Sequence, residues 1–385
     1  MIGSKTKNFA CTVEILSLVI LTFSPLIPRI VSIGLTLLLI LISMRSLMQS
    51  NHGDVPMERT ILIAMICFAL AMLWDIWNTF GGQPYSMVNF MYPCYFLCGY
   101  FVAKRYSRAQ FYDIVEKIAF VCAILSLVGM SVYFINSSWI YSFPTYVQNE
   151  QTHHTIFFFN YLFSGDWMAV RNCGLAWEPG AFQILLNIAF QISIQRHDGK
   201  KLVARVCVYS IAIILTRSTI GYAVLAINFF SLVRKHKKYL FPILAIGVLG
   251  SALVFSELVY QVQNKLWGSS AFGARFEPLV NAIRYAWYMP LGLGSTGYDA
   301  IYELERLGSY DCYTQILLRF GYPMLIYVGG RLFRIFKQDN KYIAMILIIS
   351  FLSEPIWGSV LMTSMYYLEN NKPLEGANGE RSVSV

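Results

Sequence analysis

The chain has 385 residues, of which 56% are hydrophobic and only 13% are charged, and its net charge is +9. Apolar runs of helix length recur from one end to the other, which excludes a soluble domain built on one core and indicates an integral membrane protein. The positive charge gathers in short connections between these runs, so it indicates membrane topology rather than nucleic-acid binding.

The apolar runs predict an all-α, polytopic membrane protein whose single domain covers residues 1–368. The first run follows Lys5 and Lys7 and lacks a small-residue cleavage motif, so we expect it to be retained as a span. With the N-terminus in the cytoplasm, the basic connections lie inside, as the positive-inside rule requires. The predicted spans number about eleven: 10–26, 30–44, 60–78, 87–103, 111–135, 180–195, 202–215, 219–233, 239–255, 314–333 and 342–361.

Three segments fall outside this helical pattern. Residues 136–179 and 256–311 form two long outer loops, and loops of this length are often functional. Both loops are rich in aromatic and polar residues, which fits a surface that binds sugar; an aromatic belt at the membrane boundary is the alternative. The polar tail, residues 369–385, has too little apolar surface to fold, and we expect it to be disordered.

Arginines on the outer side are exceptions to the charge pattern. A guanidinium binds phosphate oxygens bidentately and stays charged, so a diphosphate is one explanation; a salt bridge or a snorkelling side chain is the other. Arg217 lies in a tight turn between two short apolar helices, near the outer membrane boundary. The basic residues that this topology places outside are Arg29, Arg171, Arg217, Lys265, Arg275, Arg284 and Arg306.

The end of the first outer loop runs Arg171-Asn172-Cys173-Gly174-Leu175-Ala176-Trp177-Glu178-Pro179. Pro179 fits the first position of a helix, which places Glu178 at the helix N-terminus, where the dipole favours a carboxylate. Glu178 is therefore either a helix cap or a functional carboxylate that orients Arg171 or accepts a proton from a sugar hydroxyl. The pattern leaves both interpretations open.

The second outer loop contains Arg275, then a predicted short helix between Pro278 and Pro290 with an apolar stripe that suits a membrane interface. Arg275 precedes this helix, whereas Arg284 would lie on its opposite side, so we favour Arg275 for a diphosphate. The glycine-rich turn that follows, 290–297, could offer backbone N–H groups to an anion through Gly292 and Gly294. It is not a Walker loop.

Taken together, these elements resemble the O-antigen polymerase and ligase superfamily. The resemblance runs from about Arg171 to Pro323 and rests on loose motifs in a specific order. They are Arg171 with Gly174, Glu178 and Pro179; the segment 215–221 around Arg217; Arg275 ahead of the turn with Gly292 and Gly294; and 311–321 leading into a span.

The resemblance implies a metal-independent glycosyltransferase of the bacterial inner membrane that needs no cofactor. It would transfer a growing glycan from undecaprenyl diphosphate onto an incoming undecaprenyl-diphosphate-linked repeat unit at the outer face. Arg171 and Arg275 would be catalytic, with Glu178 or Asp311 as the candidate base. The implied partners are the lipid-linked oligosaccharide, membrane lipids and a chain-length regulator protein; Arg217, Gly174, Arg284, Gly292, Gly294 and Tyr310 would contact substrate.

Two other functions remain as alternatives. A ligase that transfers glycan to lipid A core typically has a His-Asn pair where this chain has Tyr310-Asp311, and the departure favours a polymerase. A flippase or transporter would carry charges deep in several spans, and Glu14, Asp75 and Glu354 are the candidates here. The outer-side cysteines Cys173 and Cys312 both flank the predicted site, and a disulfide between them is a further hypothesis.

Overall fold

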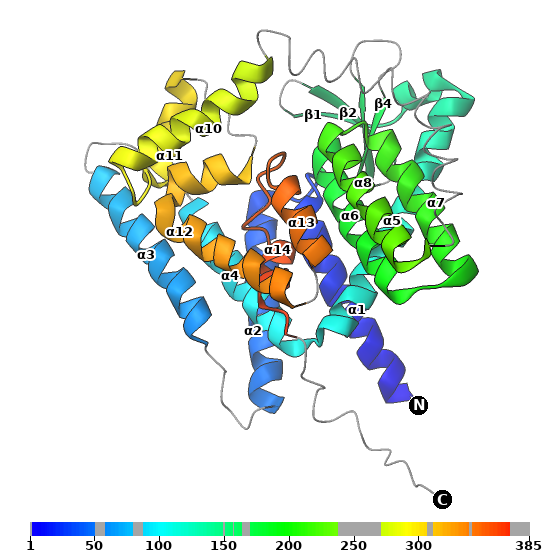
Figure 1. The fold of residues 1–385 in the computed structure, drawn as a ribbon, viewed down its shortest axis with the longest axis horizontal. Helices are drawn as coiled ribbons and strands as arrows, with labels where there is room; N and C mark the ends of the chain where they lie inside the picture. Colours follow the sequence, from blue (N-terminus) through cyan, green and yellow to red (C-terminus); the bar gives the residue numbers. More distant parts are fainter. Residues whose placement is uncertain are drawn as a thin grey trace, which may run out of the picture.

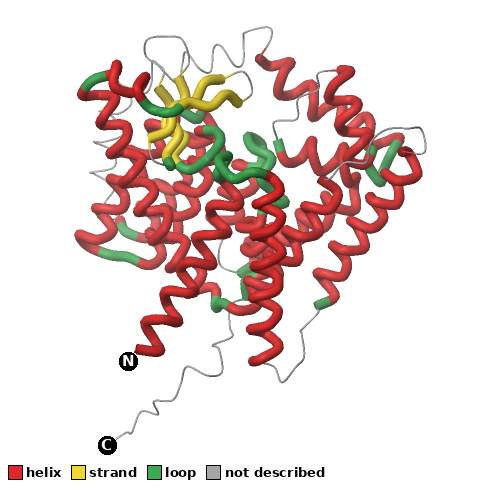
Figure 2. The backbone as a smooth tube through the Cα atoms, turned by 180° about the vertical axis from the view of Figure 1, so that it is seen from behind, coloured by secondary structure: helices red, strands yellow, loops and turns green. Residues whose placement is uncertain are grey.

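The computed structural model describes residues 2–50, 58–79, 88–148, 151–156, 158–163, 170–237, 271–305, 311–338 and 341–369, and this part of the chain is mostly helical. The predicted span 239–255, the site candidate Tyr310 and the tail from residue 370 onward lie outside these ranges. The helices lie roughly alongside one another, and a small sheet lies across one end (Figures 1 and 2).

The first five helices match the first five predicted spans. Among the described residues, three helices contain segments long and apolar enough to cross a membrane: Ile30–Gln49, Arg59–Trp77 and Arg108–Ile135. Their exposed apolar side chains indicate association with a membrane. The helices are α1 (Ile2–Phe23), α2 (Arg29–Ser50), α3 (Arg59–Thr79), α4 (Val88–Arg105) and α5 (Arg108–Ile135).

The two ends of the molecule differ in character. The end that carries the sheet, which we call the sheet end, is the upper one in Figure 1. The other, which we call the basic end, holds the chain's N-terminus and most of the helix termini that carry lysine or arginine. Among these are Lys104 and Arg105 of α4, Arg196 of α6 (Pro179–Arg196), Lys200 of α7 (Gly199–Thr216), Lys235 of α8 (Thr219–Lys235) and Lys337 of α12 (Cys312–Lys337).

The first outer loop is not irregular, and the expectation of a purely α fold is wrong in this respect. After a short 3-10 helix, Ser137–Ser142, it forms a four-stranded antiparallel sheet in the order β1-β2-β3-β4. The segments are rich in aromatic and β-branched residues, which fit a pleated surface, but each is too short to stand out from a loop. The strands are β1 (Thr145–Gln148), β2 (Gln151–Ile156), β3 (Phe159–Phe163) and β4 (Val170–Gly174).

Helix α6 is the central helix of the described bundle, since every residue from Pro179 to Ile194 is buried. It packs against α5, α7 and α8. One face carries Gln183, Asn187 and Gln191 at successive turns. Asn228 of α8 donates to the Asn187 side-chain oxygen at 2.9 Å, and Gln191 donates to the Ser231 hydroxyl at 3.0 Å. Buried side-chain hydrogen bonds of this kind hold membrane helices in register.

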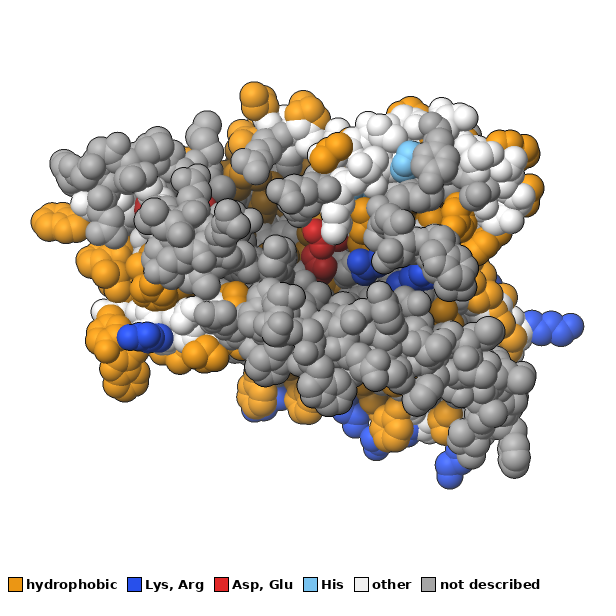
Figure 3. Space-filling view, turned by 90° about the horizontal axis from the view of Figure 1, so that it is seen from above, with side chains coloured by type: hydrophobic (Ala, Val, Ile, Leu, Met, Phe, Trp, Pro, Cys, Tyr) orange, Lys and Arg blue, Asp and Glu red, His pale blue; other side chains and the backbone are white. Residues whose placement is uncertain are grey.

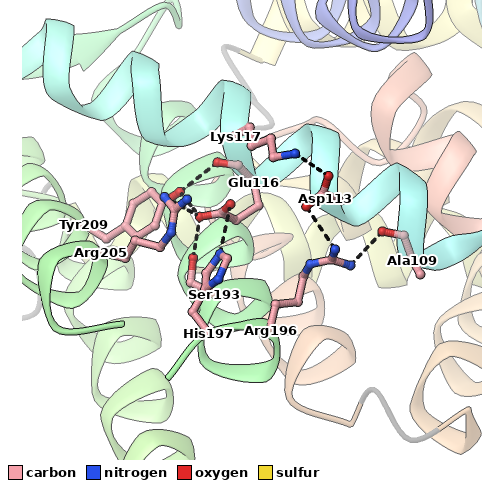
Figure 4. A network of polar contacts seen from close by, with 9 residues as sticks. All are labelled: Ala109, Asp113, Glu116, Lys117, Ser193, Arg196, His197, Arg205 and Tyr209. Atoms are coloured by element: carbon pink, nitrogen blue, oxygen red, sulfur yellow. Dashed lines mark hydrogen bonds and ion pairs between the residues drawn. The ribbon is translucent and has the colours of Figure 1, made fainter. Parts of the chain in front are cut away.

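At the basic end, a buried charge network joins α5, α6 and α7 (Figure 4). Glu116 of α5 is fully buried; its carboxylate lies 2.9 Å from Arg205 of α7 and accepts a hydrogen bond from Ser193 of α6 at 2.8 Å. His197, at the end of α6, contacts the same carboxylate at 3.5 Å. The network fixes three helices whose opposite ends lie near the sheet.

The second outer loop differs from its prediction in where the helix begins. Helix α10 spans Ala271–Tyr288, so Arg275 lies inside it instead of preceding it, and Pro278 lies in the helix interior, where it removes one backbone hydrogen bond. Ala282 and Ala286 face α12, whereas Val280, Ile283 and Trp287 form an exposed apolar stripe. Helix α11 (Gly294–Glu305) follows, close to the start of α12.

Helix α12 kinks at Gly321, whose φ of 68° interrupts the helix two residues before Pro323. The 290–293 turn packs into the break. The backbone N–H of Leu293 donates to the Leu318 carbonyl at 2.6 Å, and a side chain at Gly292 would collide with the backbone of Arg319.

The last predicted span, 342–361, is wrong as a single helix. The chain forms α13 (Lys341–Ser350), a non-helical segment that contains Pro355, and α14 (Val360–Tyr367). Glu369 then lies 2.8 Å from Lys104 and 3.5 Å from Arg334, which are both at the basic end. The chain therefore turns back toward the side on which it began, and the structure does not confirm a count of eleven spans.

Candidate functional site

Arg171 lies on β4, a strand that is tied firmly to the helices below it. The side chain of Asn172 donates to the Ser126 hydroxyl of α5 and accepts from the Gly174 backbone N–H, both at 3.0 Å. Gly174 has a φ of 54°, and any side chain here would collide with the ring of Phe182 on α6. Gly174 thus has a structural role, and it fixes the strand that presents Arg171.

The structure brings the predicted residues Arg171 and Arg217 together. The Arg171 Nε donates to the Thr216 carbonyl at 3.2 Å, and its Nη2 donates to the Arg217 carbonyl at 3.4 Å. These are the last carbonyls of α7, where a cation is favoured by the helix dipole. Burial lowers the pKa of Arg171, while the nearby carboxylates of Glu178 and Glu354 act against this shift. The guanidinium remains charged.

Arg217 occupies the tight turn that the sequence predicts, with α7 ending at Thr216 and α8 beginning at Thr219. Its backbone is left-handed, with φ 50° and ψ 37°, and among the described non-glycine residues it alone has a positive φ. Glycine or asparagine usually fills such a position. Ser218 then caps α8 by accepting a hydrogen bond from the Gly221 N–H at 3.2 Å. The turn therefore holds a strained arginine between two well-defined helix ends.

Glu178 is placed as the sequence predicts, at the N-cap position of α6 with Pro179 as the first helical residue. Its side chain makes no capping hydrogen bond, however. The N-terminus of α6 is instead contacted by Glu354, whose carboxylate lies against Gly180 so closely that a side chain at Gly180 would collide with it. The capping interpretation of Glu178 is therefore not confirmed, and its functional role stays a prediction.

Sequence reasoning did not assign Glu354 to the site. This residue lies in the non-helical segment between α13 and α14 and is buried, with 6% of its surface exposed. It comes from a segment far along the chain, so spacing could not connect it to Glu178. One signal could have found it: Glu354-Pro355 repeats the Glu-Pro pair of Glu178-Pro179, and both interrupt apolar runs at the same end of the molecule.

Asp311 lies beside the Glu354 segment. It caps α12 by accepting a hydrogen bond from the Thr314 N–H at 2.8 Å, and burial raises its pKa. The adjacent Cys312 N–H donates to the Phe351 carbonyl at 2.8 Å, which ties this helix start to the segment that carries Glu354. Cys312 and Cys173 are both free and buried, so the hypothesised disulfide between them is not formed.

These residues form what we call the Arg171 cluster: Arg171, Glu178, Arg217, Asp311 and Glu354. All come from elements that end at the sheet end. Figure 3 views the molecule from this end and shows acidic and basic side chains next to one another near the middle of the face. A cation held among carboxylates beside a membrane boundary can bind a polyanion and a hydroxyl at the same place.

The remaining predicted residues are not brought into this cluster. Arg284 is exposed on α10. The backbone of Arg275 lies in the same helix, but its side chain is outside the described part, as is the whole of Tyr310. Gly292 and Gly294 serve packing, because the anion at their turn is the chain's own Asp75. Its carboxylate accepts hydrogen bonds from the N–H and the hydroxyl of Thr296, both at 3.0 Å.

One buried arginine was hidden from sequence reasoning because it lies inside the predicted span 314–333. Arg319 is 7% exposed; its Nη2 donates to Asp299 at 3.1 Å, and its guanidinium stacks 4.2 Å from the centre of the Tyr298 ring. Its Nε and Nη1 have no hydrogen-bond partner among the described residues. A charged group at this depth is expensive and is a candidate functional residue on that ground.

No family model, characterised protein or solved structure matches this chain. Its function is therefore argued from the Arg171 cluster and from the topology around it.

Proposed function

We propose that the chain is a multi-pass membrane glycosyltransferase of the O-antigen polymerase type. It transfers a growing glycan from undecaprenyl diphosphate onto an incoming lipid-linked repeat unit at the outer face of the bacterial inner membrane. The observation that carries the proposal is the position of Arg171: its guanidinium is held against the α7–α8 turn, at the end of the molecule opposite the basic end. By the positive-inside rule, that end faces outward.

The reaction needs a cation where the leaving group gains charge. The bond between the anomeric carbon and the diphosphate oxygen breaks, and a bond to the acceptor hydroxyl oxygen forms. Arg171 stabilises the diphosphate that leaves, because a preorganised donor in a partly buried site is far stronger than one in water. Arg217, whose backbone carbonyl accepts a hydrogen bond from Arg171, is a second candidate cation at the same turn. Arg319, which contacts Asp299, is a separate candidate for binding an anionic group.

The reaction also releases a proton from the acceptor hydroxyl, and a carboxylate can accept it. Glu178 is the best candidate, since its side chain makes no cap bond and lies within electrostatic reach of Arg171. Glu354 is more deeply buried and contacts the α6 N-terminus, which suits an orienting role. Asp311 is already engaged as the α12 cap.

The transporter alternative depends on charges deep in the bundle, and two of its three candidates have structural partners. Glu14 lies 2.6 Å from Arg105 and accepts a hydrogen bond from Ser43 at 2.9 Å. Asp75 is bonded to Thr296 at the start of α11. The third, Glu354, belongs to the Arg171 cluster. This distribution supports an enzyme over a transporter.

The experiment that tests the proposal is the glycan ladder of a deletion strain complemented with Arg171→Ala, with membrane levels matched to wild type. We expect core carrying a single repeat unit, because losing one preorganised donor slows transfer by about a hundredfold or more. Lys117→Ala is the control: its side chain is 63% exposed in a surface pair outside the predicted site, so its loss should leave the ladder intact. A full ladder with Arg171→Ala would reject its role, and bare core would indicate a ligase or a flippase.

Glu178→Gln separates chemistry from capping. Because the side chain makes no cap bond, we expect the N-terminus of α6 to stay folded in this variant, while polymerisation falls roughly a hundredfold. The readouts are the thermal midpoint in detergent and the ladder. If Glu178 were only a cap, the variant would instead lose about 1 kcal/mol of stability and keep its ladder.

A further inference from the structure

A groove at the basic end is separate from the Arg171 cluster. It has a volume of about 430 Å³ and lies between the second half of α8, the last turn of α12 and the first turns of α13. Its walls are largely apolar, with Phe230 and Phe336 among them, and Phe230 is 64% exposed. Two cations, Arg234 and Lys341, line it as well.

The groove has a polar end and an apolar end. On α8, Ala226, Phe230 and Arg234 follow one another at intervals of four residues, so they form one stripe about 12 Å long with the cation at the helix's basic end. On α13, Lys341 and Met345 are also four residues apart, again with the cation at the basic end. Both walls therefore carry charge at the membrane boundary and hydrocarbon toward the membrane interior.

Within the described part of the chain, the two cations at the charged end have no carboxylate partner. Neither Arg234 nor Lys341 contacts a carboxylate among the described residues; Lys341 lies 5.6 Å over the Tyr342 ring. The hydroxyl of Tyr342, which lines the groove too, is buried and has no hydrogen-bond partner in the described part of the chain. Two cations without a carboxylate partner at one end of an apolar groove match the phosphodiester of a lipid.

We propose that this groove binds one anionic glycerophospholipid of the inner leaflet. The headgroup phosphate lies between Arg234 and Lys341, and one acyl chain lies along Ala226, Phe230 and Met345. Lipid binding in this groove does not require the transfer reaction, so it can be tested independently of the proposed function.

The test uses the full-length, delipidated protein in neutral detergent, with lipid binding measured by native mass spectrometry. The probes are phosphatidylglycerol and phosphatidylcholine with identical acyl chains. We expect wild type to retain one phosphatidylglycerol about 30-fold more tightly than phosphatidylcholine, the ratio that follows from about 1 kcal/mol for each cation. Arg234→Gln/Lys341→Gln should lose this preference. Lys200→Gln/Lys201→Gln, which removes two exposed charges from the same end, should keep it.

A second pair of variants tests the acyl-chain wall without changing charge. Ala226→Trp should fill the groove and weaken phosphatidylglycerol binding at least tenfold, whereas Ala204→Trp, on the exposed surface of α7, should not. Equal binding of both lipids by wild type, or unchanged binding by either groove variant, would overturn the proposal. Complete displacement of phosphatidylglycerol by an equimolar isoprenyl phosphate would also overturn it, because the occupant would then be the isoprenoid carrier.

Discussion

One residue of the Arg171 cluster occupies its position at a cost in folding stability. A non-glycine residue in the left-handed region costs on the order of 1 kcal/mol, and Arg217 bears that cost where glycine would avoid it. Gly174 and Gly180 avoid such a cost, because a side chain at either position would collide with a neighbouring residue. Strain of this kind persists where the surrounding structure holds a residue for its function.

Asp311 provides a test at the same scale. Because burial raises its pKa, the folded chain holds this proton more tightly than the unfolded chain does. Its contribution to folding stability is full below about pH 4, the ordinary value for aspartate, and is lost as pH rises through the raised value. Asp311→Asn removes this dependence and keeps an N-cap. We expect the thermal midpoint of wild type to fall relative to that of Asp311→Asn as pH rises above 4.

The matched variant for this prediction is Asp311→Ala, which should lose about 1 kcal/mol of stability because Thr314 loses its capping acceptor. Midpoints of wild type and Asp311→Asn that run parallel across the pH range would contradict the burial of an ionisable carboxyl at this position.

At the scale of elements, the placement of α6 and α7 explains why the cluster is rigid at the sheet end. Their basic ends are joined through Glu116, and the middle of α6 is joined to α8 through buried amide side chains. Each helix therefore cannot shift along its axis without breaking a buried polar contact. The helix ends that carry Glu178 and Arg217 are therefore also held in fixed positions along the helix axes.

Glu116→Gln tests this coupling. It leaves Arg205 buried without its counter-charge, and we expect a loss of about 3 kcal/mol of stability. Asp113→Asn is the control, since its carboxylate is 28% exposed in a surface pair with Lys117 and Arg196 and should contribute less than about 1 kcal/mol. Thermal unfolding in detergent measures both. Equal losses in the two variants would show that the buried network does not couple the helices.

For the whole molecule, the apolar runs were enough to predict most of the helices. The predicted runs 60–78 and 111–135 differ from α3 and α5 by a few residues, because the length of a membrane helix follows from apolar run length alone. The features that could not be predicted from the sequence depend on tertiary contacts. The sheet is built from short strands, each of which pairs with a neighbour across a turn. The break between α13 and α14 lies in a nearly continuous apolar run, and it is explained only by the contacts that the segment with Glu354 and Pro355 makes with α6 and α12.

The candidate site also contains some residues that could be predicted from the sequence and others that could not. Arg171, Glu178 and Arg217 could be predicted because each stands at a helix or strand boundary that the sequence marks with proline, glycine or a tight turn. Glu354 and Arg319 could not, because one is placed by a distant segment and the other lies within an apolar helix.

The turn at residues 351–359 has a consequence for topology. Glu369 contacts Lys104 and Arg334, so we expect residue 369 to lie on the same side of the membrane as the N-terminus. A fluorescent protein fused after Glu369 should then fluoresce in the cytoplasm, whereas alkaline phosphatase fused there should be inactive. The reverse result would restore a single span at 342–361.

The most direct test of the central claim is reconstitution of the purified protein in vesicles with an undecaprenyl-diphosphate-linked repeat unit. The measured quantities are chain length and released undecaprenyl diphosphate. We predict lengthening glycans with one undecaprenyl diphosphate released for each new linkage, and neither product with Arg171→Ala. Movement of the intact lipid-linked unit across the membrane, without chain extension or release of the diphosphate, would contradict a polymerase and identify a transporter.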